Sequence, residues 1–209
     1  MDKNNDPVYS HNVVELVAVA NEYCKYAEHA SDIGGMEMLK IMQRLLPLLY
    51  LKTSLLPEME PFFSDGNEKF VTENDWNNVY DTLRLKLGNA NDFTSEMSDS
   101  LDDSGIPVPV TIAENMADIY QDLKDFLLLY QTGTSEVMND AVWECRLNFE
   151  TIWGKKLINT LNAIHAFLYS GQEIEEFSDE TSTGTNEADT GDWIISKRFK
   201  DFSKDEEPI

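Results

Sequence analysis

The sequence predicts an all-α protein, a single bundle of five or six helices that spans about residues 10–170. Two observations predict this class: apolar residues recur every three or four positions over long stretches, and strand-like alternation never extends beyond a few residues. The clearest helical face carries Met116, Ile119, Tyr120, Leu123, Leu127 and Tyr130. A chain of 209 residues, 42% of them hydrophobic, is long enough for one domain of ordinary size and a tail.

Two apolar stretches near the N-terminus predict the first two helices, at residues 10–30 and 36–55. Gly34 and Gly35 separate them, because a glycine pair interrupts a helix. The second stretch is apolar on nearly all sides, so we expect it to be the central helix, covered by the others. Pro47 lies within it and lacks the N–H of a helical residue, so it should kink or divide this segment.

Capping residues mark the next two helices. A loop rich in proline ends at Thr72, which is placed to cap a third helix that Gly88 terminates. Residues 91–110 show no periodicity and carry many carboxylates, which predicts a long, mobile acidic loop. Thr111 and Glu114 then form a predicted capping box for the fourth helix.

An unbroken apolar pattern follows, from residue 134 to residue 169. Because its members recur every three or four positions throughout, it favours one long C-terminal helix over two separate helices. Gly154 is the natural place for a bend, since glycine costs about 1 kcal/mol relative to alanine inside a helix.

The composition changes at both ends of the chain. Residues 1–9 predict a flexible N-terminus, without the basic and apolar regions of a signal peptide. Residues 171–209 contain 12 Asp and Glu residues against 4 Lys and Arg residues, which predicts an acidic and largely disordered tail.

One segment of this tail, residues 193–202, is aromatic and basic. Its apolar side chains are Trp193, Ile194, Ile195, Phe199 and Phe202, and its basic side chains are Lys197, Arg198 and Lys200. Removing such apolar side chains from water is favourable, so we expect the segment to bind a surface of its own domain or of a neighbouring chain. The alternative is a tail whose aromatic residues bind nothing.

The net charge of −23 excludes several classes of partner. Phosphate backbones and anionic membranes attract basic proteins, so we expect neither nucleic acid nor a membrane to be a partner. The most apolar stretch, residues 45–56, is also too short to span a bilayer. We therefore expect a cytoplasmic protein, and one that attracts a basic protein partner.

The residues that most often carry chemistry give no catalytic, cofactor or metal site. Cys24 and Cys145 lie in apolar helical patterns and are expected to be buried free thiols. Asp118, Asp122 and Asp125 share one helical face opposite an apolar stripe, so we interpret them as a solvated face. The three histidines lack the spacing of metal ligands, and no motif of a hydrolase or phosphate loop occurs.

Trp76, Tyr80, Asp81 and Arg84 on the third helix form a possible pocket. Aromatic side chains with a few polar neighbours are typical of small-ligand sites between helices. At helical spacing, however, the same aromatic residues are also typical of a packed core.

Several segments resemble a family of bacterial helical proteins, domain of unknown function 5063. These segments are residues 45–57 (LLPLLYLKTSLLP), 75–84 (DWNNVYDTLR), 115–125 (NMADIYQDLKD), 143–145 (WEC) and 153–157 (WGKKL). The resemblance covers roughly residues 10–170 and implies an all-helical fold in a bacterial cytoplasm. It transfers no catalytic residue, and the acidic tail lies outside it.

These patterns favour a non-enzymatic acidic module that binds a basic protein partner, since opposite charge speeds association. One version is an inhibitor or immunity-type protein that blocks a nucleic-acid-binding partner by mimicking its charge. The alternative is an enzyme or small-ligand binder with a pocket between helices. A homodimer formed through apolar surface is a third possibility.

Overall fold

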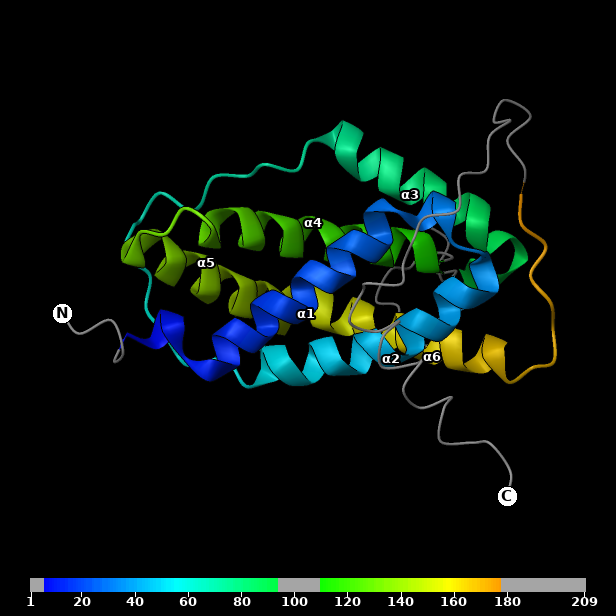
Figure 1. Ribbon diagram of the computed structural model, residues 1–209, viewed down its shortest axis with the longest axis horizontal. Helices are drawn as coiled ribbons and strands as arrows, with labels where there is room; N and C mark the ends of the chain where they lie inside the picture. The colour runs from blue at the N-terminus through cyan, green and yellow to red at the C-terminus, as the bar shows by residue number, and fades with distance from the viewer. Residues whose placement is uncertain (1–5, 94–109, 178–209) are drawn as a thin grey trace, which may run out of the picture.

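The computed structural model describes residues 6–93 and 110–177. The predictions made for residues 1–5, for most of the acidic loop and for residues 178–209 of the tail, including 193–202, lie outside these ranges. Within them the chain is an all-α bundle with one long C-terminal helical path, which confirms the predicted class (Figure 1). Its α-helices are α1 (His11–Glu28), α2 (Gly35–Ser54), α3 (Glu73–Leu87), α4 (Ile112–Tyr130), α5 (Ser135–Asn148) and α6 (Gly154–Leu168).

Shorter elements join these helices. They are 3-10 turns at Pro7–Tyr9 (η2), Ala30–Asp32 (η3) and Gly88–Ala90 (η4), a π-helical segment at Phe149–Trp153 (η5), and strands β1 (Asp92–Phe93) and β2 (Val110–Thr111). The two strands pair antiparallel, with Asp92 opposite Thr111. The predicted acidic loop is therefore held together at its base. No helix in the described ranges is long and apolar enough to cross a membrane.

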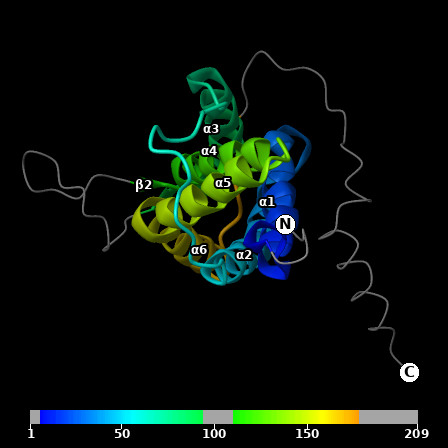
Figure 2. The same ribbon diagram turned by 90° about the vertical axis from the view of Figure 1, so that its left-hand side faces the viewer.

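The central helix is α4, and the prediction that residues 36–55 form it was wrong. Helix α4 packs against α1, α3, α5 and α6, and Figure 2 shows it enclosed by neighbouring helices. Helix α2 leaves Tyr50, Leu51 and Leu55 between 39% and 51% exposed. The apolar content of a helix does not reveal which of its faces are covered, because that depends on the positions of the other helices.

Pro47 does not divide α2, which continues through it from Gly35 to Ser54. The Pro47 side chain is exposed, so it lies on the solvent side of the helix. Water can therefore hydrate the Gln43 carbonyl that proline leaves without a helical donor.

The long C-terminal helix is confirmed, and its irregularity is a π-helical turn. Residues 135–168 are helical throughout, with η5 between α5 and α6. Gly154 follows this turn directly, and a Cβ there would overlap the Phe149 carbonyl oxygen. Glycine thus makes room for the wider turn, and Trp153 at its end is fully buried.

Both predicted helix caps are present. The Thr72 hydroxyl accepts from the Asp75 N–H, and the Asp75 carboxylate accepts from the Thr72 N–H, so α3 has a complete capping box. The Thr111 hydroxyl accepts from the Glu114 N–H at 3.1 Å, the first half of the box predicted for α4.

The first residues of the predicted tail lie against the bundle as a strap, residues 173–177. The Phe177 N–H donates to the Leu85 carbonyl at 2.9 Å. A Glu176 carboxylate oxygen accepts from the Gly35 N–H at 2.7 Å and so caps α2, whose own N-cap residue offers no side chain. Asn89 bonds both the Glu173 carbonyl and the Glu175 N–H.

Two glycines allow the close approaches on which this end of the bundle depends. A Cβ at Gly35 would overlap the Lys86 carbonyl, and a Cβ at Gly88 would overlap the Glu175 carbonyl. Gly88 also has φ of +48°, a conformation that other residues rarely adopt. Gly88 therefore ends α3, as predicted, and also admits the strap.

We expect Gly88→Ala to lower the free energy of unfolding by about 2–4 kcal/mol, because it adds both backbone strain and overlap with the strap. The control is Gly133→Ala, where φ is +77° and the space beyond is open. It should cost only about 1 kcal/mol, the strain term alone. Urea unfolding followed by circular dichroism measures both values, and equal losses would contradict the proposed contact.

Candidate functional site

Residues 57–71 join α2 to α3 and expose several phenylalanine side chains, so we call them the phenylalanine loop. They run along the outside of α5 and reach α3 at the opposite side of the bundle (Figures 1 and 2). The loop has no regular secondary structure, so its backbone N–H groups need acceptors from elsewhere. Buried carboxylates of α4 and α5 supply them.

Asp140 on α5 fixes the first part of the loop. Its two carboxylate oxygens accept from the N–H groups of Phe62 at 2.6 Å and Phe63 at 2.8 Å. Its neighbour Asn139 donates to the Glu60 carbonyl at 2.7 Å. Asp140 is buried, so these charge-assisted bonds are shielded from water and hold this backbone in place.

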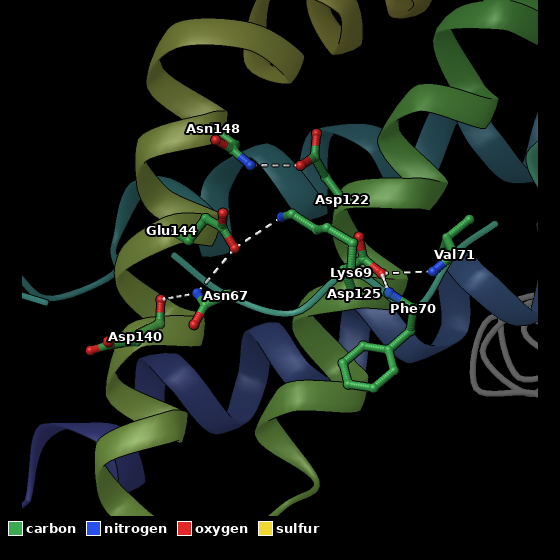
Figure 3. A network of polar contacts seen from close by, with 9 residues as sticks. All are labelled: Asn67, Lys69, Phe70, Val71, Asp122, Asp125, Asp140, Glu144 and Asn148. Atoms are coloured by element: carbon green, nitrogen blue, oxygen red, sulfur yellow. Dashed lines mark hydrogen bonds and ion pairs between the residues drawn. The ribbon is translucent and has the colours of Figure 1, made fainter. Parts of the chain in front are cut away.

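Asp125 on α4 fixes the last part of the loop in the same way. One of its oxygens accepts from the N–H groups of Phe70 at 2.8 Å and Val71 at 2.9 Å. Between these anchors, Asn67 donates to both the Asp140 carbonyl and the Glu144 carboxylate, each at 3.0 Å. Lys69 pairs with the same Glu144 oxygen at 3.0 Å (Figure 3).

The interpretation of Asp118, Asp122 and Asp125 as a solvated face was wrong. Asp125 is only 2% exposed, Asp122 accepts from the Asn148 amide at 2.7 Å, and Asp118 accepts from the Trp76 indole at 2.9 Å and pairs with Lys156. The apolar stripe of α4 does face the core. The opposite side is covered too, by the loop, by α3 and by the α5–α6 helix, so no side of this helix is fully solvated.

Burial also affects ionisation in this network. Desolvation raises the pKa of the Asp122 carboxyl, and the negative charges of Glu144 and Asp125 act in the same direction. The Asn148 hydrogen bond and the Lys69 charge oppose the shift but do not cancel it. The ionised form of Asp122 is therefore less favourable in the folded chain than in the unfolded one.

The outer surface of the loop is apolar and acidic. Phe62 is 66% exposed, Phe63 is 54% exposed and Phe70 is 37% exposed. The exposed carboxylates of the loop are Glu58, Glu60, Asp65 and Glu68, and its single basic residue, Lys69, is already paired with Glu144. This combination is complementary to an apolar segment with basic flanks.

The residues of the predicted pocket divide into two pairs. Trp76 and Tyr80 stack with ring centroids 5.1 Å apart, and the Trp76 indole is directed at Asp118 of α4. Arg84 lies 3.7 Å from the Asp81 carboxylate, at the surface of the same helix. The binding of a small ligand by these four residues stays a prediction.

Two other groups of candidate residues are now placed. Cys24 and Cys145 are buried free thiols, as predicted, and burial raises the pKa of both. This makes them poor nucleophiles. No cluster of three His, Cys, Asp or Glu residues in the described ranges is arranged to hold a metal ion.

Sequence reasoning missed the phenylalanine loop because it treated the segment only as a break between helices. A signal was present: Phe62 and Phe63 are adjacent aromatic residues between Pro61 and Gly66, in a stretch too short and too polar for a helix. Asp140 gave no such signal, because an aspartate within a helix is usually exposed.

Comparison with known proteins identifies a matching family and a similar solved structure. The model of the family described as domain of unknown function DUF5063 matches residues 7–170. The crystal structure of protein BF1032 from Bacteroides fragilis, a structural genomics target, is similar with a TM-score of 0.71 and 36% sequence identity. The similarity covers 79% of this chain and 98% of that one. None of the curated proteins matches the chain.

We expect Asp125→Ala to lower the free energy of unfolding by about 2–4 kcal/mol, since it leaves two loop N–H groups without their acceptor. The amides of Phe70 and Val71 should also exchange faster. Asp81→Ala is the control, because Asp81 is exposed and its pairing with Arg84 is worth little. Urea unfolding and hydrogen exchange measure both variants, and equal behaviour of the two would contradict the anchoring role.

We expect Asp122→Asn to stabilise the protein at neutral pH. A carboxyl with a raised folded-state pKa destabilises the fold once it is ionised, and this penalty vanishes below the pKa of the unfolded chain. Asparagine carries no charge and still accepts from Asn148. The difference in unfolding free energy between variant and wild type should therefore be positive at pH 7 and shrink toward zero in acid. A pH series of urea unfolding tests this, and a difference that grows in acid would refute it.

Proposed function

We propose that this chain, which belongs to the family described as domain of unknown function DUF5063, is a non-enzymatic protein-interaction module. It acts in the cytoplasm and binds a basic protein partner on the phenylalanine loop. One version is an inhibitor or immunity-type protein that occupies the basic surface of a nucleic-acid-binding partner.

The observation that carries this proposal is an immobilised loop that presents phenylalanine rings to solvent. Burying a carboxylate is costly unless it is well bonded, and two of them, Asp125 and Asp140, are buried here to hold loop amides. Full burial of a phenylalanine is worth about 1.5–3 kcal/mol, and this loop leaves most of that unused at Phe62 and Phe63. A loop that only connected two helices would need neither feature.

Such an arrangement suits recognition. Binding residues are often carried on loops that a rigid scaffold positions, and aromatic side chains supply much of the free energy at protein interfaces. Because the loop is already ordered, binding of a partner does not have to offset the conformational entropy that would be lost in ordering it.

Charge supports a basic partner. The exposed carboxylates around Phe62 and Phe63 create a negative surface in a chain whose net charge is −23. A partner with apolar side chains flanked by Lys and Arg would be attracted at long range and would cover the rings at short range. An acidic partner would be repelled.

We expect the double variant Phe62→Ser, Phe63→Ser to lose its basic partner in pull-downs from bacterial lysate. The loss follows because serine removes both apolar contacts while leaving the backbone bonds to Asp140 possible. Proteins captured by the wild type at low salt and released at high salt should be absent from the variant.

The control is Phe177→Ser, a residue 52% exposed at the other end of the molecule. It should capture the same basic proteins as the wild type. If the double variant captures them equally well, or if the wild type captures no basic protein at low salt, the proposal fails.

A further inference from the structure

We infer that the phenylalanine loop also binds residues 193–202 of a second copy of this chain. This inference rests on the proposed function, because it uses the same loop, and it names a second occupant for it. Each contact joins two different surfaces, the loop of one copy and the tail segment of the other.

The chemistry of residues 193–202 matches what the loop requires. The segment reads WIISKRFKDF, with three basic residues against one acidic residue, in a chain that has 39 acidic and 16 basic residues overall. It combines aromatic rings that can cover Phe62 and Phe63 with cations that can face the loop carboxylates. It is the part of the chain where aromatic and basic residues are most concentrated.

The helical domain offers no comparable basic surface. Eleven Lys and Arg residues lie in the described ranges, and eight of them form ion pairs with acidic residues of the same domain. Those cations are already neutralised. If one copy of the chain binds the acidic loop of another, residues 193–202 are the basic segment best suited to do so.

The strap argues for a second copy rather than the segment's own domain. It fixes the chain at Phe177, beside Leu85 near the C-terminal end of α3. Phe62 and Phe63 lie beside Asp140 in the first half of α5, and Figure 1 shows this part of the loop at the opposite end of the bundle from the strap.

The length of the intervening chain makes the same point. Fifteen residues, 178–192, separate the strap from Trp193. A flexible chain of that length spans about 21 Å on average. This is about the length of α3 alone, and the two rings lie beyond the far end of α3. Docking on the same molecule would require this chain to extend beyond its average span, whereas docking on a second copy would not.

The test compares self-association of full-length chains by sedimentation velocity over a range of concentrations. The loop variant carries Phe62→Ser and Phe63→Ser, and the tail variant carries Trp193→Ser and Phe199→Ser. The wild type should associate as its concentration rises, and each variant alone should stay monomeric. An equal mixture of the two variants should associate, because the intact tail of the first can bind the intact loop of the second.

The control Tyr169→Ser alters an exposed aromatic residue outside both surfaces and should associate as the wild type does. A wild type that is monomeric at every concentration would overturn the inference. So would a tail variant that associates normally, or a mixture that stays monomeric. Protection of amides 193–202 from exchange in a monomer would show docking on the same molecule and would also overturn it.

The pull-down separates this result from the proposed function. The tail variant keeps an intact loop, so it should still capture the basic partner even when it no longer self-associates. A monomeric wild type whose partner capture still depends on Phe62 and Phe63 would reject the second-copy inference alone. Capture that is unaffected by the loop variant would reject the proposed function.

Discussion

The surface of this bundle depends on carboxylates that are buried to satisfy a loop. Asp125 and Asp140 are 2% and 3% exposed. Each of them accepts hydrogen bonds from two consecutive backbone N–H groups of the phenylalanine loop. The loop has no ladder or helix of its own, so these bonds determine where it lies. Because the loop is held in place, α4 is covered on the side opposite the core, and the phenylalanine rings face outward.

The same constraint determines what the loop can contribute to binding. A mobile loop with exposed phenylalanines would tend to fold its rings back onto the nearest apolar surface. Here the backbone bonds at residues 62, 63, 70 and 71 prevent that collapse and keep the rings available. A partner would therefore make the apolar contact without having to offset the conformational entropy lost in ordering the loop. Under the proposed function, the acidic side chains between the rings select partners by charge.

Sequence periodicity was sufficient to predict the helices but not to predict how they pack against one another. The long pattern of residues 134–169 and the caps at Thr72 and Thr111 depend on local chemistry, so they could be predicted. The central position of α4 depends on how whole helices are arranged around it. The burial of Asp125 and the strap contact at Gly88 depend on residues far away in sequence, such as Phe70 and Glu175. A single sequence gives the residue types at those positions but not which neighbour covers them. For the same reason Asp122 was expected on a solvated face, although Asn148 and the loop enclose it.

The distribution of charge also bears on how the proposed module could recognise one partner without binding every cation indiscriminately. Among the described residues, three groups of acidic side chains matter here: those buried against loop amides, those paired with the domain's own basic residues, and those left exposed. The first two groups are already compensated locally, so their contribution to the field at the surface is reduced. Of the exposed carboxylates of the phenylalanine loop, Glu58 pairs with Arg146, whereas Glu60, Asp65 and Glu68 form no ion pair within the described ranges. These three stand on the same loop as the apolar rings, which water solvates poorly. In the proposed interaction, charge attracts a basic partner to this surface and burial of the rings decides whether it stays, so specificity would come from the two features occurring together on one fixed loop.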